Sequence, residues 1–171
     1  NRTNLMKLVG SFIILTRKSK KEVFLVKRSD FSVWECQGGG IENDETPEIT
    51  AVRETYEETG FRIKIIKKVA EYTNFNSNKI TSHVFTGKYI SGTFKPEYKD
   101  CEGKWFSTNN LPLQMTATRR MMIEDCLNNR NDLIIKPEIP AVSIQNIKLL
   151  FLLPLQSVKY IYSLIFKSRL F

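Results

Sequence analysis

The chain has 171 residues, of which 42% are apolar and 26% are charged, and its net charge is +8. These proportions fit one soluble globular domain with a sizeable core, and no internal repeat or low-complexity stretch interrupts the sequence. The three cysteines form no C-x-x-C pair, which argues against a disulfide framework or a structural zinc site; with no secretory signal at the start, we expect a reducing cytoplasm.

Two apolar stretches come first. Residues 8–16 and 22–28 alternate like β-strands on either side of a polar turn, which predicts a hairpin. Arg28 ends the second stretch, and its forked guanidinium suits a phosphate, although a surface charge at a strand end is an equal alternative. Trp34 either stacks on a base or packs beneath the following loop, and we favour packing because most tryptophans are structural.

A glycine-rich loop and a helix follow. The glycines at 38–40 let the backbone approach a ligand closely. Thr46 suits the helix N-cap, Pro47 suits the first helical position, and Gly60 ends the helix. At about 100° per residue the apolar side chains share one face, which we assign to the core: Ile49, Val52 and Tyr56.

The opposite face of this helix carries Glu54, Glu57 and Glu58. Like charges at these spacings each cost a helix about 0.2–0.5 kcal/mol, and Arg53 is the counter-charge beside them. Converging carboxylates are typical of a hard-cation site, because Mg²⁺ takes oxygen ligands and keeps waters for substrate phosphates. An acidic face turned to solvent is the alternative interpretation.

The spacing of these residues resembles the Nudix box. The motif runs Gly39, five residues, Glu45, seven residues, Arg53-Glu54, two residues, Glu57-Glu58, one residue, Gly60 and the apolar Phe61. Thr55 stands where the family usually has an aliphatic side chain, and Gln37 stands where many members have proline. The first departure weakens a packing contact and the second alters the loop, but neither removes a chemical group.

The resemblance implies a MutT-like Nudix hydrolase with an α/β/α sandwich fold, a mixed sheet between helices. It implies Mg²⁺, with Mn²⁺ as a substitute, held by the Gly39 carbonyl and by Glu54, Glu57, Glu58 and Glu102. It also implies catalytic roles for these glutamates, with Arg53 bracing Glu45 and with Glu54 or Glu102 as the general base. Substrate contacts are expected at Arg28, Trp34, Gly38, Gly39 and Gly40. The metal would polarise phosphoryl oxygens and lower the pKa of a bound water.

Beyond the motif, residues 63–75 and 79–90 predict two paired strands with a turn between them. In residues 96–107, Glu102 precedes Trp105 by three positions, as an acid often precedes a Trp-led strand in this family. Glu97 and Asp100 are close enough in sequence to take the role of Glu102, and an acid facing solvent is the simpler alternative.

A second helix is predicted over residues 115–130. Its apolar stripe consists of Met122, Ile123, Cys126 and Leu127. Arg119 and Arg120 lie near its start, and we expect them on the surface rather than at substrate phosphates.

The last stretch, 141–171, has four basic residues and no acid. We expect the Nudix domain over 1–135 and a helical extension over 136–171, with Leu155, Val158, Tyr162 and Ile165 at helical spacing. Pro154 divides the stretch, and neither part has the ~20 apolar residues of a membrane span. Packing on the domain or in a homodimer is favoured over lying on an anionic membrane surface, because serines make the polar face only weakly basic.

The stretches around the motif are most similar to the dATP-type nucleoside triphosphate pyrophosphohydrolases, which predicts hydrolysis of a nucleoside triphosphate to monophosphate and pyrophosphate. ADP-ribose, dinucleoside polyphosphates and capped RNA are alternative substrates. The competing class is a nucleotide-sensing module, or an adaptor acting through the tail, and such proteins usually lack some of the motif acids. None is missing here. A basic net charge alone is weak support for nucleic acid as a partner.

Overall fold

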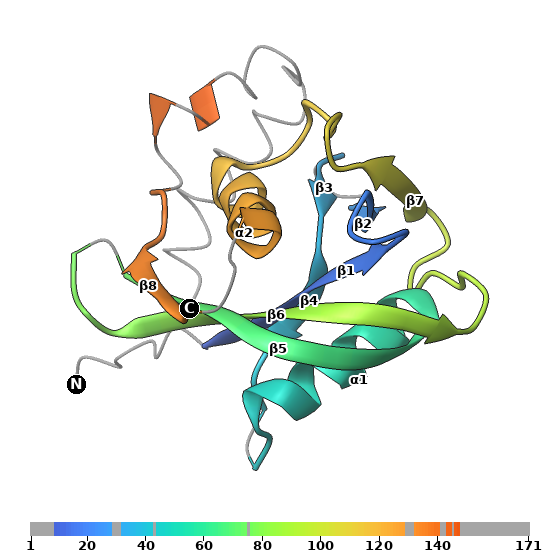
Figure 1. Cartoon of the computed structure of the whole chain (residues 1–171), viewed down its shortest axis with the longest axis horizontal. Helices are drawn as coiled ribbons and strands as arrows, with labels where there is room; N and C mark the ends of the chain where they lie inside the picture. The colour runs from blue at the N-terminus through green and yellow to red at the C-terminus, as the bar shows by residue number, and fades with distance from the viewer. Residues whose placement is uncertain are drawn as a thin grey trace.

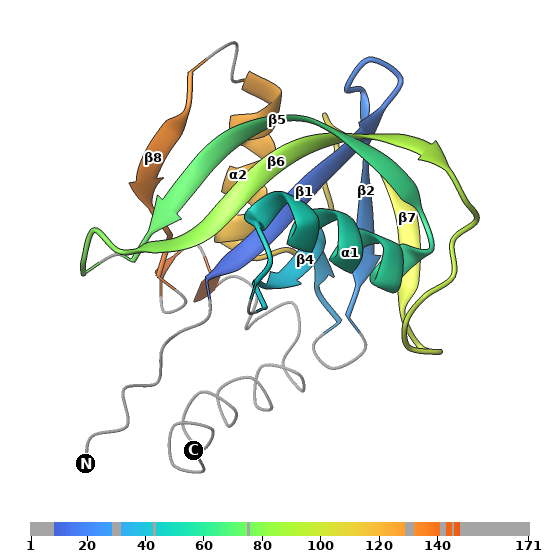
Figure 2. The ribbon, with the colours of Figure 1, turned by 90° about the horizontal axis from the view of Figure 1, so that it is seen from below.

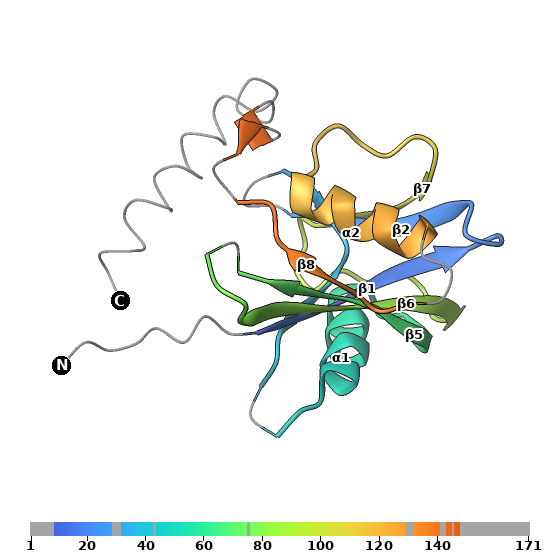
Figure 3. The ribbon, with the colours of Figure 1, turned by 60° about the vertical axis from the view of Figure 1, so that its left-hand side comes forward.

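The computed structural model describes residues 9–28, 32–42, 44–74, 76–128, 132–140, 143–144 and 146–147. Over these residues the strands form one mixed sheet of eight strands with a helix on each face (Figures 1 and 3). This is the α/β/α sandwich that the sequence predicted. The elements are β1 Gly10–Arg17, β2 Glu22–Lys27, β3 Trp34–Glu35, β4 Gln37–Gly40, α1 Pro47–Thr59, β5 Arg62–Thr73, β6 Ile80–Ser91, β7 Glu102–Ser107, α2 Ala117–Asn128 and β8 Ile134–Pro137.

Strand β1 organises the sheet. It forms the predicted antiparallel hairpin with β2, pairs antiparallel with β4 and pairs in parallel with β6. The predicted long pair, β5 with β6, is also present, and β8 adds to β5 in parallel. The β1–β4 register places Gly38 opposite Phe12 and Gly39 opposite Ser11. The glycine-rich stretch is therefore held as a strand beside β1, and α1 packs next to it (Figure 2).

Both ends of α1 lie where the sequence predicted. The Thr46 hydroxyl accepts a hydrogen bond from the Ile49 N–H at 3.3 Å, and Pro47 is the first helical residue. Gly60 ends the helix in the left-handed region, with φ of 71°, and its N–H donates to the Tyr56 carbonyl at 2.7 Å. The left-handed conformation favours glycine here.

The prediction that the apolar stripe of α1 faces the core is wrong. Ile49 and Tyr56 are each 54% exposed, and Val52 is 41% exposed. The buried face instead carries small side chains: Thr50, Ala51, Thr55 and Thr59. Small residues allow α1 to lie close to β1, β4 and β5. The two threonines nearest the end of the helix donate their hydroxyls to carbonyls one turn earlier, which satisfies these buried donors.

The main core lies on the other face of the sheet, under α2. Met122, Ile123 and Cys126 are buried there, as the sequence predicted. Next to the end of α1, the ring of Phe61 packs against that of Phe24 with centroids 4.7 Å apart. This aromatic contact anchors the end of the motif helix to the sheet.

Strand β8 continues the folded unit past the domain boundary expected at residue 135, which falls inside the strand. Beyond it, a Glu138 carboxylate oxygen accepts a hydrogen bond from the Ser82 hydroxyl at 2.5 Å, and Asn146 Oδ1 accepts one from the Ala117 N–H at 2.8 Å. The expected tail helix over 155–171, with its homodimer and membrane alternatives, lies outside the described residues. Among the helices within them, none is long and apolar enough to cross a membrane.

Candidate functional site

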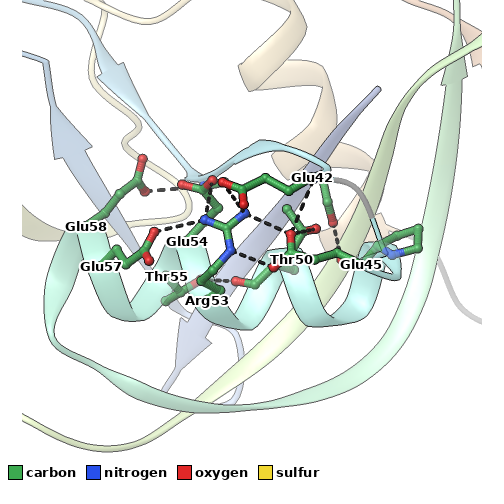
Figure 4. A network of polar contacts seen from close by, with 12 residues as sticks. Glu42, Glu45, Thr50, Arg53, Glu54, Thr55, Glu57 and Glu58 are labelled. Carbon is green, nitrogen blue, oxygen red and sulfur yellow. Dashed lines mark hydrogen bonds and ion pairs between the residues drawn. The ribbon is translucent and has the colours of Figure 1, made fainter. Parts of the chain in front are cut away.

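Helix α1 presents its charged face beside β4 and the loop that joins β4 to the helix (Figure 4). Because the threonine and alanine face packs on the sheet, the charged side chains emerge at its side. They are Arg53, Glu54, Glu57 and Glu58, and Glu45 meets them from the loop. The structure therefore brings together the residues that the sequence spacing singled out in this helix and its loop.

Arg53 is the centre of an ion-pair network (Figure 4). Its Nε lies 2.7 Å from Glu45 Oε1 and its Nη2 lies 2.9 Å from Glu45 Oε2, which makes a two-bond fork. Its Nη1 donates to Glu54 Oε1 at 3.0 Å and to Glu57 Oε2 at 2.9 Å. The Arg53–Glu45 brace expected between loop and helix is present.

This network keeps Glu45 charged. Hydrogen bonds from Arg53 and then from the Thr50 hydroxyl lower the pKa of the Glu45 carboxyl to about 2. The same bond to Glu45 raises the pKa of Arg53 above its ordinary value. Both groups remain ionised at neutral pH, so they hold the loop on the helix and carry no proton in a reaction.

The pKa of Glu58 is shifted in the opposite direction from that of Glu45. Glu58 lies at the inner side of the charged face, where the Gly38 N–H donates to its Oε2 at 3.3 Å. Burial raises the pKa of its carboxyl to about 8, the Gly38 hydrogen bond partly offsets that rise, and the charges of Glu54, Glu35 and Glu97 add to it. A carboxyl held among other carboxylates with one backbone donor is a group whose charged form a cation would stabilise.

The pKa of Glu54 is subject to both influences. Burial raises the pKa of its carboxyl, and the ion pair with Arg53 opposes this. Its carboxylate touches the backbone of β4, since a Cβ built on Gly39 would fall 2.4 Å from Glu54 Oε1. Any side chain at 39 would displace this carboxylate, so glycine here allows the close approach of Glu54.

The oxygen donors suit a small, hard divalent cation. However, the described residues include no three acidic, histidine or cysteine side chains gathered closely enough to hold an ion. The predicted convergence is not seen because Glu54 and Glu57 turn onto Arg53, whereas Glu58 turns onto Gly38. The Glu57 side chain is 50% exposed, which leaves it room to change rotamer. Carboxylate crowding and the bare backbone at Gly39 make the donor set suitable for a cation.

The structure describes the surroundings of Glu102, the acid that the resemblance named as a further ligand or base. Glu102 is the first residue of β7, 65% exposed, and its Oε1 lies 3.2 Å from Lys27 Nζ. The acid of that stretch whose charge raises the pKa of both Glu54 and Glu58 is Glu97, one of the two substitutes that the sequence offered. Glu35 in β3 is a neighbour of Glu58 that sequence reasoning missed, because only the pairing of β3 with β2 brings it to the site.

The expected substrate contacts are distributed unevenly. Gly38 and Gly39 adjoin the glutamates, and Gly40 continues β4. Arg28 Nη1 lies 3.9 Å from Glu35 Oε2, which places this guanidinium next to a neighbour of Glu58. Trp34 is 8% exposed and packs edge-on against Phe106, so it is a core residue, as favoured.

Comparisons with known proteins agree with this geometry. The model of the NUDIX domain matches residues 6–126. A putative 8-oxo-dGTP diphosphatase of Bacillus subtilis (strain 168) is 33% identical over 126 residues, covering 72% of this chain and 82% of that protein. An RNA pyrophosphohydrolase of Gluconobacter oxydans (strain 621H) is 34% identical over 87 residues, covering 50% of this chain and 47% of that protein.

Solved structures share the fold. A NUDIX hydrolase from Nitrosomonas europaea superposes with a TM-score of 0.65 at 21% identity, covering 77% of this chain and 78% of that one. An ADP-ribose pyrophosphatase from Streptococcus suis 89-1591 superposes with a TM-score of 0.61 at 18% identity, covering 77% of this chain and 99% of that one. The domain match spans most of the chain and coincides with the glycine strand and glutamate helix described above. The chain belongs to the Nudix hydrolase family.

Proposed function

We propose that this protein hydrolyses a nucleoside triphosphate to the monophosphate and pyrophosphate, with Mg²⁺ or Mn²⁺ as its cofactor. The observation that carries the proposal is the crowding at the inner side of α1. Glu58 and Glu54 lie beside the bare backbone of Gly38 and Gly39, with the charge of Glu97 added. Such an arrangement is electrostatically unfavourable alone and favourable around a cation with bound phosphate.

The residues divide the work. A divalent cation held by Glu54, Glu57, Glu58 and the Gly39 carbonyl would neutralise charge on the phosphate oxygens and acidify a water. Glu54 is the base candidate, because its pKa is raised and its carboxylate touches the loop backbone. Glu97 takes the place of Glu102 as the acid that completes the site. The water oxygen bonds to phosphorus, the bridging P–O bond breaks, and the water proton passes to the carboxylate.

A triphosphate is supported by the names of two relatives. The B. subtilis relative is named for 8-oxo-dGTP, and a 29% identical relative from Haemophilus influenzae is a dihydroneopterin triphosphate diphosphatase. The net charge of +8 favours binding of polyanions in general. A reducing, cytoplasmic location stays part of the proposal, and the three cysteines are free in the structure.

The test is a substrate panel with Mg²⁺, then Mn²⁺, in which phosphate and pyrophosphate release are measured separately. The panel holds the eight common nucleoside triphosphates, an oxidised guanine triphosphate, ADP-ribose, diadenosine polyphosphates and capped RNA. We expect pyrophosphate from a triphosphate and no release in EDTA. Turnover of ADP-ribose or capped RNA alone would overturn the triphosphate proposal. If the protein binds nucleotides but hydrolyses none of them, the proposal of an enzyme is overturned in favour of a nucleotide-sensing module.

For the tail we propose packing on the domain or on a second copy of the chain, rather than contact with a membrane surface. Ile144 and Ile147 lie in the described first part of the tail and are exposed apolar side chains that such packing would cover. Deleting residues 148–171 should change the mass measured by light scattering or lower the solubility, with turnover per folded molecule retained. Unchanged mass and solubility would contradict this.

A further inference from the structure

From the sequence we expect Arg119 on the surface, but the structure shows it partly buried against an aromatic ring. Arg119 projects from the first turn of α2 and places its guanidinium carbon 3.8 Å from the centroid of the Phe12 ring. That ring lies across the glycines of two strands: a Cβ at Gly10 or at Gly38 would fall 2.6 or 2.7 Å from it. The guanidinium therefore lies over a ring that rests on the backbone of β1 and β4.

This stack adjoins the site from the opposite face of the sheet. Gly38, beneath the Phe12 ring, is the residue whose N–H donates to Glu58 of α1. The thiol of Cys36, two residues before Gly38, is affected by charged side chains of both helices. Burial raises the pKa of its thiol to about 11, the charge of Arg119 lowers it, and the charges of Glu35 and Glu58 raise it. Arg119 and Glu58 thus lie on either side of the same short segment.

The charge of Arg119 lacks a matching anion in the described part of the chain, where no carboxylate lies within ion-pair distance of it. The guanidinium donates from Nη1 to the Met122 sulfur at 3.3 Å, and a thioether is a weak acceptor. Outside the described residues the sequence holds a single acidic side chain, Asp30. A partly buried guanidinium in this state is suited to an external anion.

We propose that Arg119, oriented by the Phe12 ring, binds phosphate oxygens of the nucleotide from the α2 face of the sheet. The inference rests on the proposed function, since it takes the glutamates of α1 as the place where the phosphate chain is cleaved. Arg119 would hold phosphate that the glutamates, being negative themselves, repel without a cation. It is a binding residue, so its loss should weaken binding more than it slows the chemical step.

The experiment compares Arg119→Met with Arg119→Lys and with Arg120→Met as control. Methionine keeps an apolar stem over Phe12 while removing the charge. Arg120 is next along the helix and donates instead to the Pro112 carbonyl at 2.7 Å. We expect Arg119→Met to raise KM for the triphosphate about 10- to 100-fold with kcat nearly unchanged, as for loss of a charge-assisted hydrogen bond. Arg119→Lys should be intermediate, and Arg120→Met should match the wild type.

A second measurement does not depend on turnover. Calorimetric titration in EDTA compares a non-hydrolysable triphosphate analogue with the corresponding nucleoside. Arg119→Met should weaken binding of the analogue and leave that of the nucleoside unchanged, with an unaltered thermal unfolding midpoint. Equal KM values and equal analogue binding would overturn the inference, as would equal weakening for the nucleoside, which would mean contact with the base. If the wild type binds the analogue through Arg119 but hydrolyses nothing, the proposed hydrolysis fails, whereas the phosphate-binding role of Arg119 is retained.

Discussion

The two helices of this protein differ in which face is buried. In α2 the apolar stripe is buried, with Met122 and Ile123 fully inaccessible. In α1 the apolar stripe is exposed, and the buried face consists of threonines and an alanine. The difference teaches that the orientation of α1 is set by its charged face and by close approach to the glycine strand, whereas α2 is oriented by hydrophobic burial. Functional sites are where such departures from simple patterning are expected.

The largest effect is expected on kcat, from a substitution in the charged face of α1 that leaves the core intact. Glu57→Gln should lower kcat about 10²- to 10³-fold, the loss typical of removing one charge-stabilising group from an active site. The fold should survive, because the Glu57 side chain is half exposed and pairs only with Arg53 among the described residues. Steady-state kinetics and circular dichroism measure both, with the exposed Glu48→Gln on the same helix as control. Near-normal turnover in Glu57→Gln would remove this helix face from catalysis.

The next effect contrasts an isoleucine from each helix. Ile123→Ala in α2 should lower the free energy of unfolding by about 2–5 kcal/mol, because a fully buried side chain is lost and a cavity remains. Ile49→Ala in α1 should change it by less than about 0.5 kcal/mol, because Ile49 is largely exposed. Urea unfolding of the two variants measures the difference. Similar losses would mean that α1 is packed through its apolar stripe after all.

A smaller effect concerns pH in the absence of metal. The pKa of Glu58 is raised from its ordinary 4.5 to about 8, so the folded state binds the extra proton between these values and stability falls as pH rises through this window. Glu45 works in the other direction: its pKa is lowered to about 2, so the stability it provides is present above pH 4.5 and is lost as pH falls towards 2. Both carboxyls should therefore make the unfolding free energy greatest in mildly acidic solution.

Urea unfolding in EDTA at pH 5, 6.5 and 8 tests this, with Glu58→Gln as the comparison. The variant should lose much of the decline between pH 5 and 8, and added Mg²⁺ should reduce the decline in the wild type by binding the deprotonated carboxylate. The same slope in both proteins would show that Glu58 titrates normally.

Local features were predictable from the sequence. The ends of α1, the Arg53–Glu45 brace and the placement of the glutamates opposite the apolar stripe all depend on spacing within one helix and its preceding loop. The β1–β2 hairpin and the β5–β6 pair were predictable for the same reason, since each joins neighbouring stretches of alternating residues.

Features that depend on packing between distant segments were not predictable. Which face of α1 is buried is decided by how closely β4 and β1 approach it, and small buried residues carry no hydrophobic signal. The effects of the Glu35 and Glu97 charges on the pKa of Glu58 arise from strand pairing and loop path. The stack of Arg119 on Phe12 joins β1 to α2, which are separated in sequence by more than half of the chain, and no local pattern predicts it.

The most direct test of the central claim, that the charged face of α1 is a cation site, is a titration of the metal-free protein with Mn²⁺, in which the free ion is followed by electron paramagnetic resonance. The account predicts saturable binding to the wild type and to Glu48→Gln, and binding to Glu57→Gln that is much weaker. Equal binding by all three proteins, or none to a wild type that hydrolyses nucleotides, would contradict it.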